Sequence, residues 1–221
     1  PEIEALLGLT REPLKGWAVD DVAAAAVGWG CRGDAATMGR LKALTAGMPL
    51  FVRSAATIAR EEYSGRIDQM CDAVDALANL TQTAQEVILA KVFDAFPLAA
   101  QQTIAVLSLS DVGLLPAEIN KLLHAALEMN ERAVAGVIRA LRAAGVVEIY
   151  GNKEIRLHDA IRVVGSQHLL SMPAEIASRT CVALKDLLVE AFERDRNTAR
   201  FSLYTRLLLA THGHHLPVAR W

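Results

Sequence analysis

Cysteine is scarce in this sequence, and its three copies show no spacing typical of a metal site or a disulfide framework. Cys31, Cys71 and Cys181 lie far apart, and no Cys-x-x-Cys or Cys-x-x-His segment surrounds them. This pattern argues against zinc binding and is typical of a reducing, cytoplasmic compartment. We interpret all three as buried packing residues rather than nucleophiles, because no histidine accompanies any of them in a recognisable motif.

Long hydrophobic runs and an excess of one charge are also missing. No apolar stretch approaches the roughly 20 residues that a membrane-spanning helix needs, and no signal peptide is present, so no membrane partner is expected. The formal net charge is -2, which does not favour a general polyanion binder. The first residue is proline rather than methionine, and we therefore expect the chain to be a piece of a longer protein.

What the sequence does contain is apolar residues that recur with helical spacing. Hydrophobic residues make up 52% of the 221 residues and aromatic residues only 5%, which together with abundant alanine and leucine predicts a mainly α fold. We expect a helical bundle, then a winged helix-turn-helix, then an α-α superhelical segment. The predicted domains are a small helical domain (residues 1–65), a helical connector (66–92), a winged-helix domain (93–165) and the start of a helical array (166–221).

The first predicted domain contains a helix stop followed at once by a helix start. Gly47 supplies the positive φ that commonly closes a helix. Pro49 follows at a helix start, where its missing N–H costs nothing.

The third predicted domain has the order helix, helix, turn, helix and hairpin, which is typical of a winged helix-turn-helix. Asn130 can cap its last helix, which Gly145 ends. Two short strands then surround the turn from Tyr150 to Lys153, and the second strand leads directly into His158.

The default partner of such a motif is DNA, and the helix after the turn, which Asn130 can cap, then lies in the major groove. Arg132 and Arg139 lie opposite the apolar stripe of that helix, and Lys153 lies in the hairpin, so these are the candidate DNA contacts. Residues 93–165 carry seven basic and eight acidic side chains, whereas a dedicated DNA binder normally has a basic face. Solvated arginines on a structural winged helix are the alternative interpretation.

Two stretches resemble motifs of the STAND-type, NB-ARC-like AAA+ ATPases. AGMPLFVRSAA, which contains Gly47 and Pro49, is similar to the Gly-x-Pro-Leu motif of their helical lid domain, and IRLHDAIR, which contains His158, is similar to the Met-His-Asp motif that ends their winged-helix domain. Leu157 stands where the family has methionine, so the His-Asp pair is kept but the motif is less specific. The order of elements is also similar, and residues 166–221 loosely resemble the start of a TPR-like sensor.

The resemblance implies roles for these residues and partners for the chain. It implies that Pro49, in the motif that Gly47 begins, packs against the adenine of a nucleotide held by an upstream P-loop domain, and that His158 reaches the β-phosphate of ADP in a closed, inactive state. The implied partners are that upstream domain of the same chain, a downstream helical sensor and, on activation, further copies of the protein.

The chain itself is not expected to be an enzyme, because it has no Gly-x-x-x-x-G-K-[ST] loop to bind phosphates. ADP or ATP with magnesium is expected in the parent protein, which we expect to be an ATPase, and no cofactor is expected for this fragment alone. No catalytic and no metal-binding residue is predicted. The histidine tract HGHH, formed by His212, His214 and His215, is interpreted as a solvated helix end rather than a metal site.

Two functions remain open at this point. One is the regulatory part of a nucleotide-dependent signal-transduction switch, for which nucleic acid is not an expected partner. The other is a winged-helix DNA-binding transcription regulator with a helical effector domain. Plainer interpretations also stand beside the first function: Gly47 and Pro49 as an ordinary helix stop and start, and His158 as a capping or packing histidine.

Overall fold

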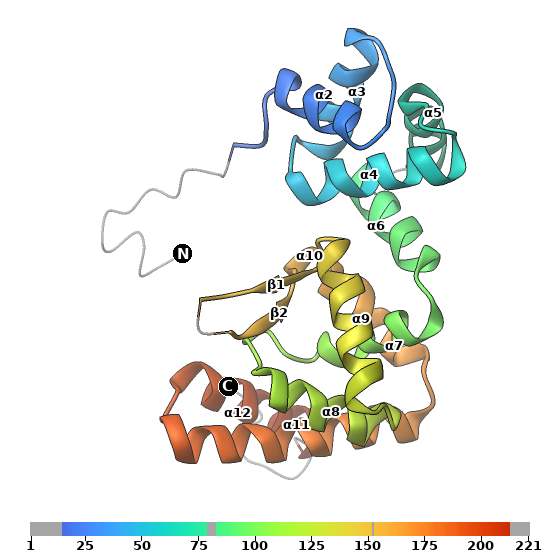
Figure 1. Cartoon of the computed structure of the whole chain (residues 1–221). Coiled ribbons are helices and arrows are strands. Elements are labelled where there is room, and N and C mark those ends of the chain that lie inside the picture. The colour runs from blue at the N-terminus through green and yellow to red at the C-terminus, as the bar shows by residue number, and fades with distance from the viewer. Residues whose placement is uncertain (1–14, 79–82, 152, 213–221) are drawn as a thin grey trace. The chain divides into compact units, whose positions relative to one another are not determined.

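The computed structural model of this chain describes residues 15–78, 83–151 and 153–212 (Figure 1). The side chains of His212, His214 and His215 lie outside the described part, as do residues 1–14 of the first predicted domain. The fold is mainly α, as predicted: 11 helices lie in the described ranges, 74% of the residues in these ranges are helical, and a two-stranded antiparallel hairpin accompanies the helices.

The chain divides into two compact units, with the division between Ile88 and Leu89. The predicted domain boundaries at residues 65, 92 and 165 stay predictions.

The first unit is a group of short helices around an aliphatic core. Its helices are α2 (Val19–Gly28), α3 (Ala35–Thr45), α4 (Pro49–Glu62), α5 (Ile67–Leu77) and the first residues of α6 (Ala84–Ala95). The Asp34 carboxylate caps α3 by accepting a hydrogen bond from the Thr37 N–H at 2.8 Å. Cys31 and Cys71 are buried, as predicted, whereas Cys181 of the second unit is only partly buried. Burial raises the pKa of the Cys71 thiol to about 11, which suits packing rather than nucleophilic chemistry.

The second unit begins with the end of α6 and contains both strands (Figure 1). Its further elements are α7 (Leu98–Leu107), α8 (Pro116–Leu127), α9 (Glu131–Ala143), β1 (Val147–Ile149), β2 (Ile155–Leu157), α10 (Asp159–Ser171), α11 (Ala174–Asp195) and α12 (Thr198–His212). The predicted hairpin is confirmed: β1 and β2 pair antiparallel, with Val147 opposite Leu157 and Ile149 opposite Ile155. Leu114 adds an antiparallel bridge to Ile155 on the other side of β2.

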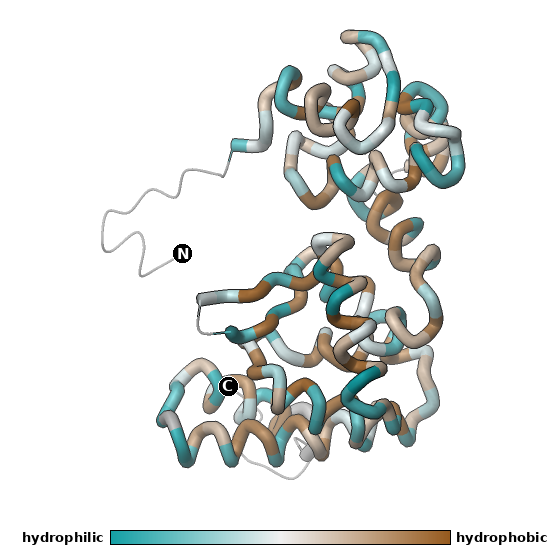
Figure 2. Tube along the Cα trace, in the orientation of Figure 1, coloured by the Kyte–Doolittle hydropathy of each residue, from teal (hydrophilic) through white to brown (hydrophobic). Residues whose placement is uncertain are grey.

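Apolar faces hold the second unit together, and their alternation with polar residues along the helices can be followed in Figure 2. The predicted stripe of α9 packs inward through Val134, Ile138 and Leu141. Helix α10 packs against α7, where Gly165 lies so close that a Cβ would approach the Ile104 carbonyl oxygen to 2.9 Å. Helix α11 packs on α8 and continues into α12, which lies beside it.

Within the described ranges, every helix is too short or too polar to cross a lipid bilayer.

Candidate functional site

The turn between α3 and α4 contains Gly47 and Pro49, two of the predicted site residues. Helix α3 ends through two successive left-handed residues, Ala46 with φ 51° and Gly47 with φ 69°. The Gly47 N–H donates to the Lys42 carbonyl oxygen at 3.1 Å and lies 3.2 Å from the Thr45 hydroxyl oxygen. Pro49 is the first residue of α4 and is exposed, so its ring is accessible on the surface of this unit.

A segment that precedes α2 holds this turn, and the sequence analysis missed it. The Trp17 N–H donates to the Gly47 carbonyl oxygen at 2.8 Å. A Cβ on Gly47 would lie 2.5 Å from the Trp17 carbonyl oxygen, and a Cβ on Gly16 would lie 2.0 Å from the Ala46 carbonyl oxygen. The two glycines therefore allow two backbone segments to touch, and this contact fixes the geometry from which Pro49 projects.

His158, the third predicted site residue, occupies the N-cap position of α10. Its backbone N–H donates to the Val146 carbonyl oxygen at 2.9 Å, and its ring Nδ1 accepts from the Ala160 N–H at 3.2 Å. A ring nitrogen that accepts is unprotonated, so this hydrogen bond favours the neutral ring with its proton on Nε2. The ring is half-buried, and Nε2 has no hydrogen-bond partner among the residues that the structure describes.

Asp159, the neighbour of His158, is engaged by arginines rather than by the histidine ring. Its carboxylate lies 2.6 Å from the Arg156 guanidinium and 3.4 Å from that of Arg162. The hydrogen bond from Arg156 holds the pKa of the Asp159 carboxyl below its ordinary value. The His-Asp pair is therefore not a hydrogen-bonded acid–base dyad, and the chemistry it offers is donation of one N–H from a neutral imidazole.

These three residues belong to different units. Gly47 and Pro49 lie in the first unit and His158 lies in the second. The geometry around Pro49 and the geometry around His158 are each defined within their own unit, and each residue lies at the start of a helix.

The candidate DNA contacts lie on one exposed face of α9 and on the hairpin. Arg132, Arg139 and Arg142 are exposed, and none of them makes an ion pair or a side-chain hydrogen bond with another described residue. Lys153 is exposed beside the hairpin turn, with φ 65°. This face offers positive charge that acidic neighbours do not neutralise by direct contact.

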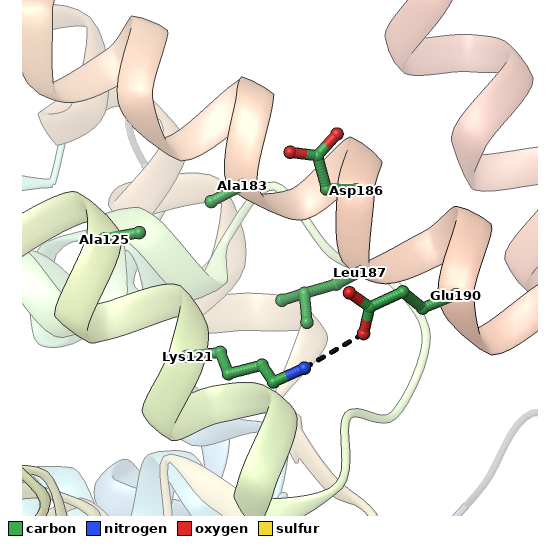
Figure 3. A pocket seen from close by; sticks show the side chains of 6 residues that line it. All are labelled: Lys121, Ala125, Ala183, Asp186, Leu187 and Glu190. Carbon is green, nitrogen blue, oxygen red and sulfur yellow. Dashed lines mark hydrogen bonds and ion pairs between the residues drawn. The ribbon is translucent and has the colours of Figure 1, made fainter.

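Two shallow grooves on the second unit lie away from the predicted residues. One runs between α8 and α11, where the Lys121 ammonium pairs with the Glu190 carboxylate at 3.0 Å (Figure 3). The other is apolar and lies between α11 and α12, where the rings of Phe192 and Phe201 are 4.9 Å apart. Neither arrangement brings together groups suited to acid–base or nucleophilic chemistry.

Comparison with protein-family models, curated proteins and solved structures finds no match for this chain.

Proposed function

We propose that this chain is the regulatory region of a nucleotide-dependent signalling switch of the STAND type, whose nucleotide is held by an upstream P-loop domain of the parent protein. In this proposal α2 to α4 form the helical lid, α5 and α6 form the connector, α7 to β2 and the start of α10 form a winged helix-turn-helix, and α11 and α12 begin a helical sensor array. The chain supplies contacts that bias the switch, and the hydrolytic groups belong to the upstream domain.

The observation that carries the proposal is the hydrogen bond from the Ala160 N–H to Nδ1 of His158, which leaves Nε2 as an N–H donor that no described residue accepts. The positive end of the helix dipole favours an anion at this place, and Nδ1 is occupied by the helix cap, so Nε2 is the nitrogen that faces a ligand. Bound ADP supplies the diphosphate that accepts this hydrogen bond. The cap holds the ring in one orientation before the ligand arrives, so the donor loses little freedom on binding.

Pro49 contributes a different kind of contact. Its ring is rigid, apolar and exposed at the first position of α4, where it suits packing against the flat face of an adenine base. The contact between Trp17 and the Gly47 turn keeps this ring in place.

The switching itself follows from differential affinity. A ligand shifts an equilibrium between two arrangements only by the free energy with which it prefers one of them. A hydrogen bond from His158 to a charged phosphate oxygen contributes about 1.5–3 kcal/mol. If that bond exists only in the closed arrangement, it favours the closed state about 10- to 100-fold.

The test uses the full-length parent protein and two histidines of α10. His158→Asn keeps a side-chain oxygen that can cap the helix but replaces the Nε2–H with the amide donor of a shorter side chain, so we expect the ADP dissociation constant to rise about 10- to 100-fold. His168→Asn is the matched control, because His168 is also half-buried in α10 and contacts the Phe93 ring at 5.0 Å. Isothermal titration that gives equal ADP affinities for the wild type and His158→Asn contradicts the proposal, and so does a parent gene without a phosphate-binding loop upstream.

The second candidate function, DNA binding, is favoured by the unpaired arginine face of α9. Fluorescence anisotropy with a duplex at low salt tests it, because phosphate contacts by Arg132 and Arg139 make binding steeply salt-dependent. Replacing both arginines with alanine is then expected to flatten the slope of log affinity against log salt by about two. Absence of duplex binding at low salt removes this candidate.

A further inference from the structure

A buried arginine joins α12 to the N-terminus of α8. Arg200 is 2% exposed and Glu118 is 6% exposed, and their two-pronged ion pair has Nη1–Oε1 and Nη2–Oε2 distances of 2.7 Å and 3.1 Å. Glu118 also accepts from the Leu115 N–H at 2.8 Å and from Arg194 at 3.3 Å. Hydrophobic residues in place of a pair desolvated to this degree are often equally stable, so net stability alone does not account for the pair, whose two-pronged contact sets how α12 meets α8.

The same guanidinium also reaches the sheet beside the hairpin. Its Nη2 donates to the Gly113 carbonyl oxygen at 3.0 Å and to the Glu154 carboxylate at 3.3 Å. These two residues immediately precede Leu114 and Ile155, whose backbones exchange hydrogen bonds of 3.0 Å and 2.8 Å. Arg200 therefore contacts both segments of the polypeptide just before the Leu114–Ile155 bridge.

The strand that Arg200 holds leads directly to His158. Glu154 precedes β2, and His158 follows the last residue of β2, about 13 Å along an extended chain. Leu157 pairs with Val147, and the His158 N–H continues the ladder by donating to the Val146 carbonyl oxygen at 2.9 Å. A shift of β2 along or away from its neighbours therefore moves the backbone that carries the imidazole.

A series of weaker ion pairs also connects α12 to the first turn of α10, which follows His158. Arg206 pairs with Asp111 at 2.7 Å, Asp111 lies 3.9 Å from Arg162, and Arg162 pairs with Asp159 at 3.4 Å. Arg206 and Asp159 are exposed, so these ion pairs contribute little by themselves. The buried contact of Arg200 is the one that can transmit a displacement of α12.

We propose that Arg200 is a positioning residue for His158: by clamping the Leu114–Ile155 bridge, it makes the placement of the imidazole depend on whether α12 is docked. A partner that pulls α12 away releases β2 and so loosens the donor. The coupling stands on the contacts alone, whereas its use in switching rests on the proposed function.

The test is amide hydrogen exchange of the 221-residue chain without nucleotide. The reporters are the amides of His158 and Ala160, which donate to the Val146 carbonyl oxygen and to the His158 ring. In Arg200→Met we expect the core amide of Ile104 to report the loss of stability of the whole unit, both reporter amides to accelerate about tenfold more than Ile104, and the ¹⁵N signal of the His158 Nδ1 to move. Arg200→Lys keeps the charge without the planar fork, and we expect it to restore part of the protection.

Lys121→Met is the matched control, because it removes an exposed ion pair between α8 and α11 (Figure 3) that does not touch the sheet. We expect it to leave both reporter amides unchanged. Wild-type exchange at the reporters in Arg200→Met overturns the inference, as does an acceleration shared equally with Ile104, which indicates general destabilisation.

If Arg200→Met does not fold, Glu154→Ala replaces it, because it removes the contact of Arg200 with the residue before β2 and leaves the Arg200–Glu118 pair and the Gly113 contact in place. About threefold faster exchange at the two reporter amides supports the inference, and no change overturns it. Because no nucleotide is present, these results are independent of whether the parent protein retains ADP, so the failure of the inference and of the proposed function can be told apart.

Discussion

Replacing Arg200 with methionine should destabilise the second unit far more than a typical surface substitution. The change leaves the Glu118 carboxylate buried without its main partner, and breaking a buried pair in this way costs about 3–5 kcal/mol. We expect the lower end, about 3 kcal/mol, because the Leu115 N–H and the half-exposed Arg194 still bond Glu118. Replacing both partners with methionine removes the buried charge, so the double variant should lie within about 2 kcal/mol of the wild type.

The assay has to follow the second unit alone, since the two units need not unfold together. The amide of Leu122, which is fully buried in α8, is suited to this assay, because such a core amide exchanges only when the whole unit opens. If Arg200→Met costs less than about 1 kcal/mol, or the double variant is less stable than the single one, Arg200 and Glu118 do not form a desolvated pair and the reasoning is refuted.

Three further predictions concern local features of the two units. Gly47→Ala should destabilise the first unit by about 1–3 kcal/mol, because the added Cβ meets the Trp17 backbone at positive φ; urea titration followed by tryptophan fluorescence in a Trp221→Phe background measures this. Asn130→Ala should cost about 1 kcal/mol by removing the cap of α9, whereas Asn130→Asp should not, and amide exchange in α9 separates them. Burial raises the pKa of the Glu118 carboxyl, but hydrogen bonds, chiefly the one from Arg200, outweigh burial and hold this pKa below its ordinary value. The stability linked to this shift is complete above about pH 4.3 and is lost as the pH falls through the lowered pKa. A profile of unfolding free energy from pH 6 to 3 that shows no loss contradicts the pairing of Glu118 with Arg200.

Local sequence signals predicted the elements around His158 correctly. Asn130 caps α9, Gly145 follows it with φ 79°, and the strands of the hairpin surround the predicted turn. These features depend on neighbouring residues, which is why periodicity and capping rules detect them.

Contacts between distant segments could not be predicted in this way. Arg200 and Glu118 are 82 residues apart, and in the sequence each reads as an ordinary charged residue of an amphipathic helix. The contact of Gly16 and Trp17 with the Gly47 turn is equally non-local. Ala46 adopts positive φ without being glycine or asparagine, because a neighbouring segment and the helix end determine its conformation rather than its own preference.

The central claim, that His158 donates to the β-phosphate of ADP, is tested most directly by ³¹P NMR of the full-length parent with ADP bound. We predict that His158→Asn moves the β-phosphate resonance and leaves the α-phosphate resonance in place, while His168→Asn moves neither. Identical β-phosphate resonances in the wild type and His158→Asn, at saturating ADP, would contradict the account.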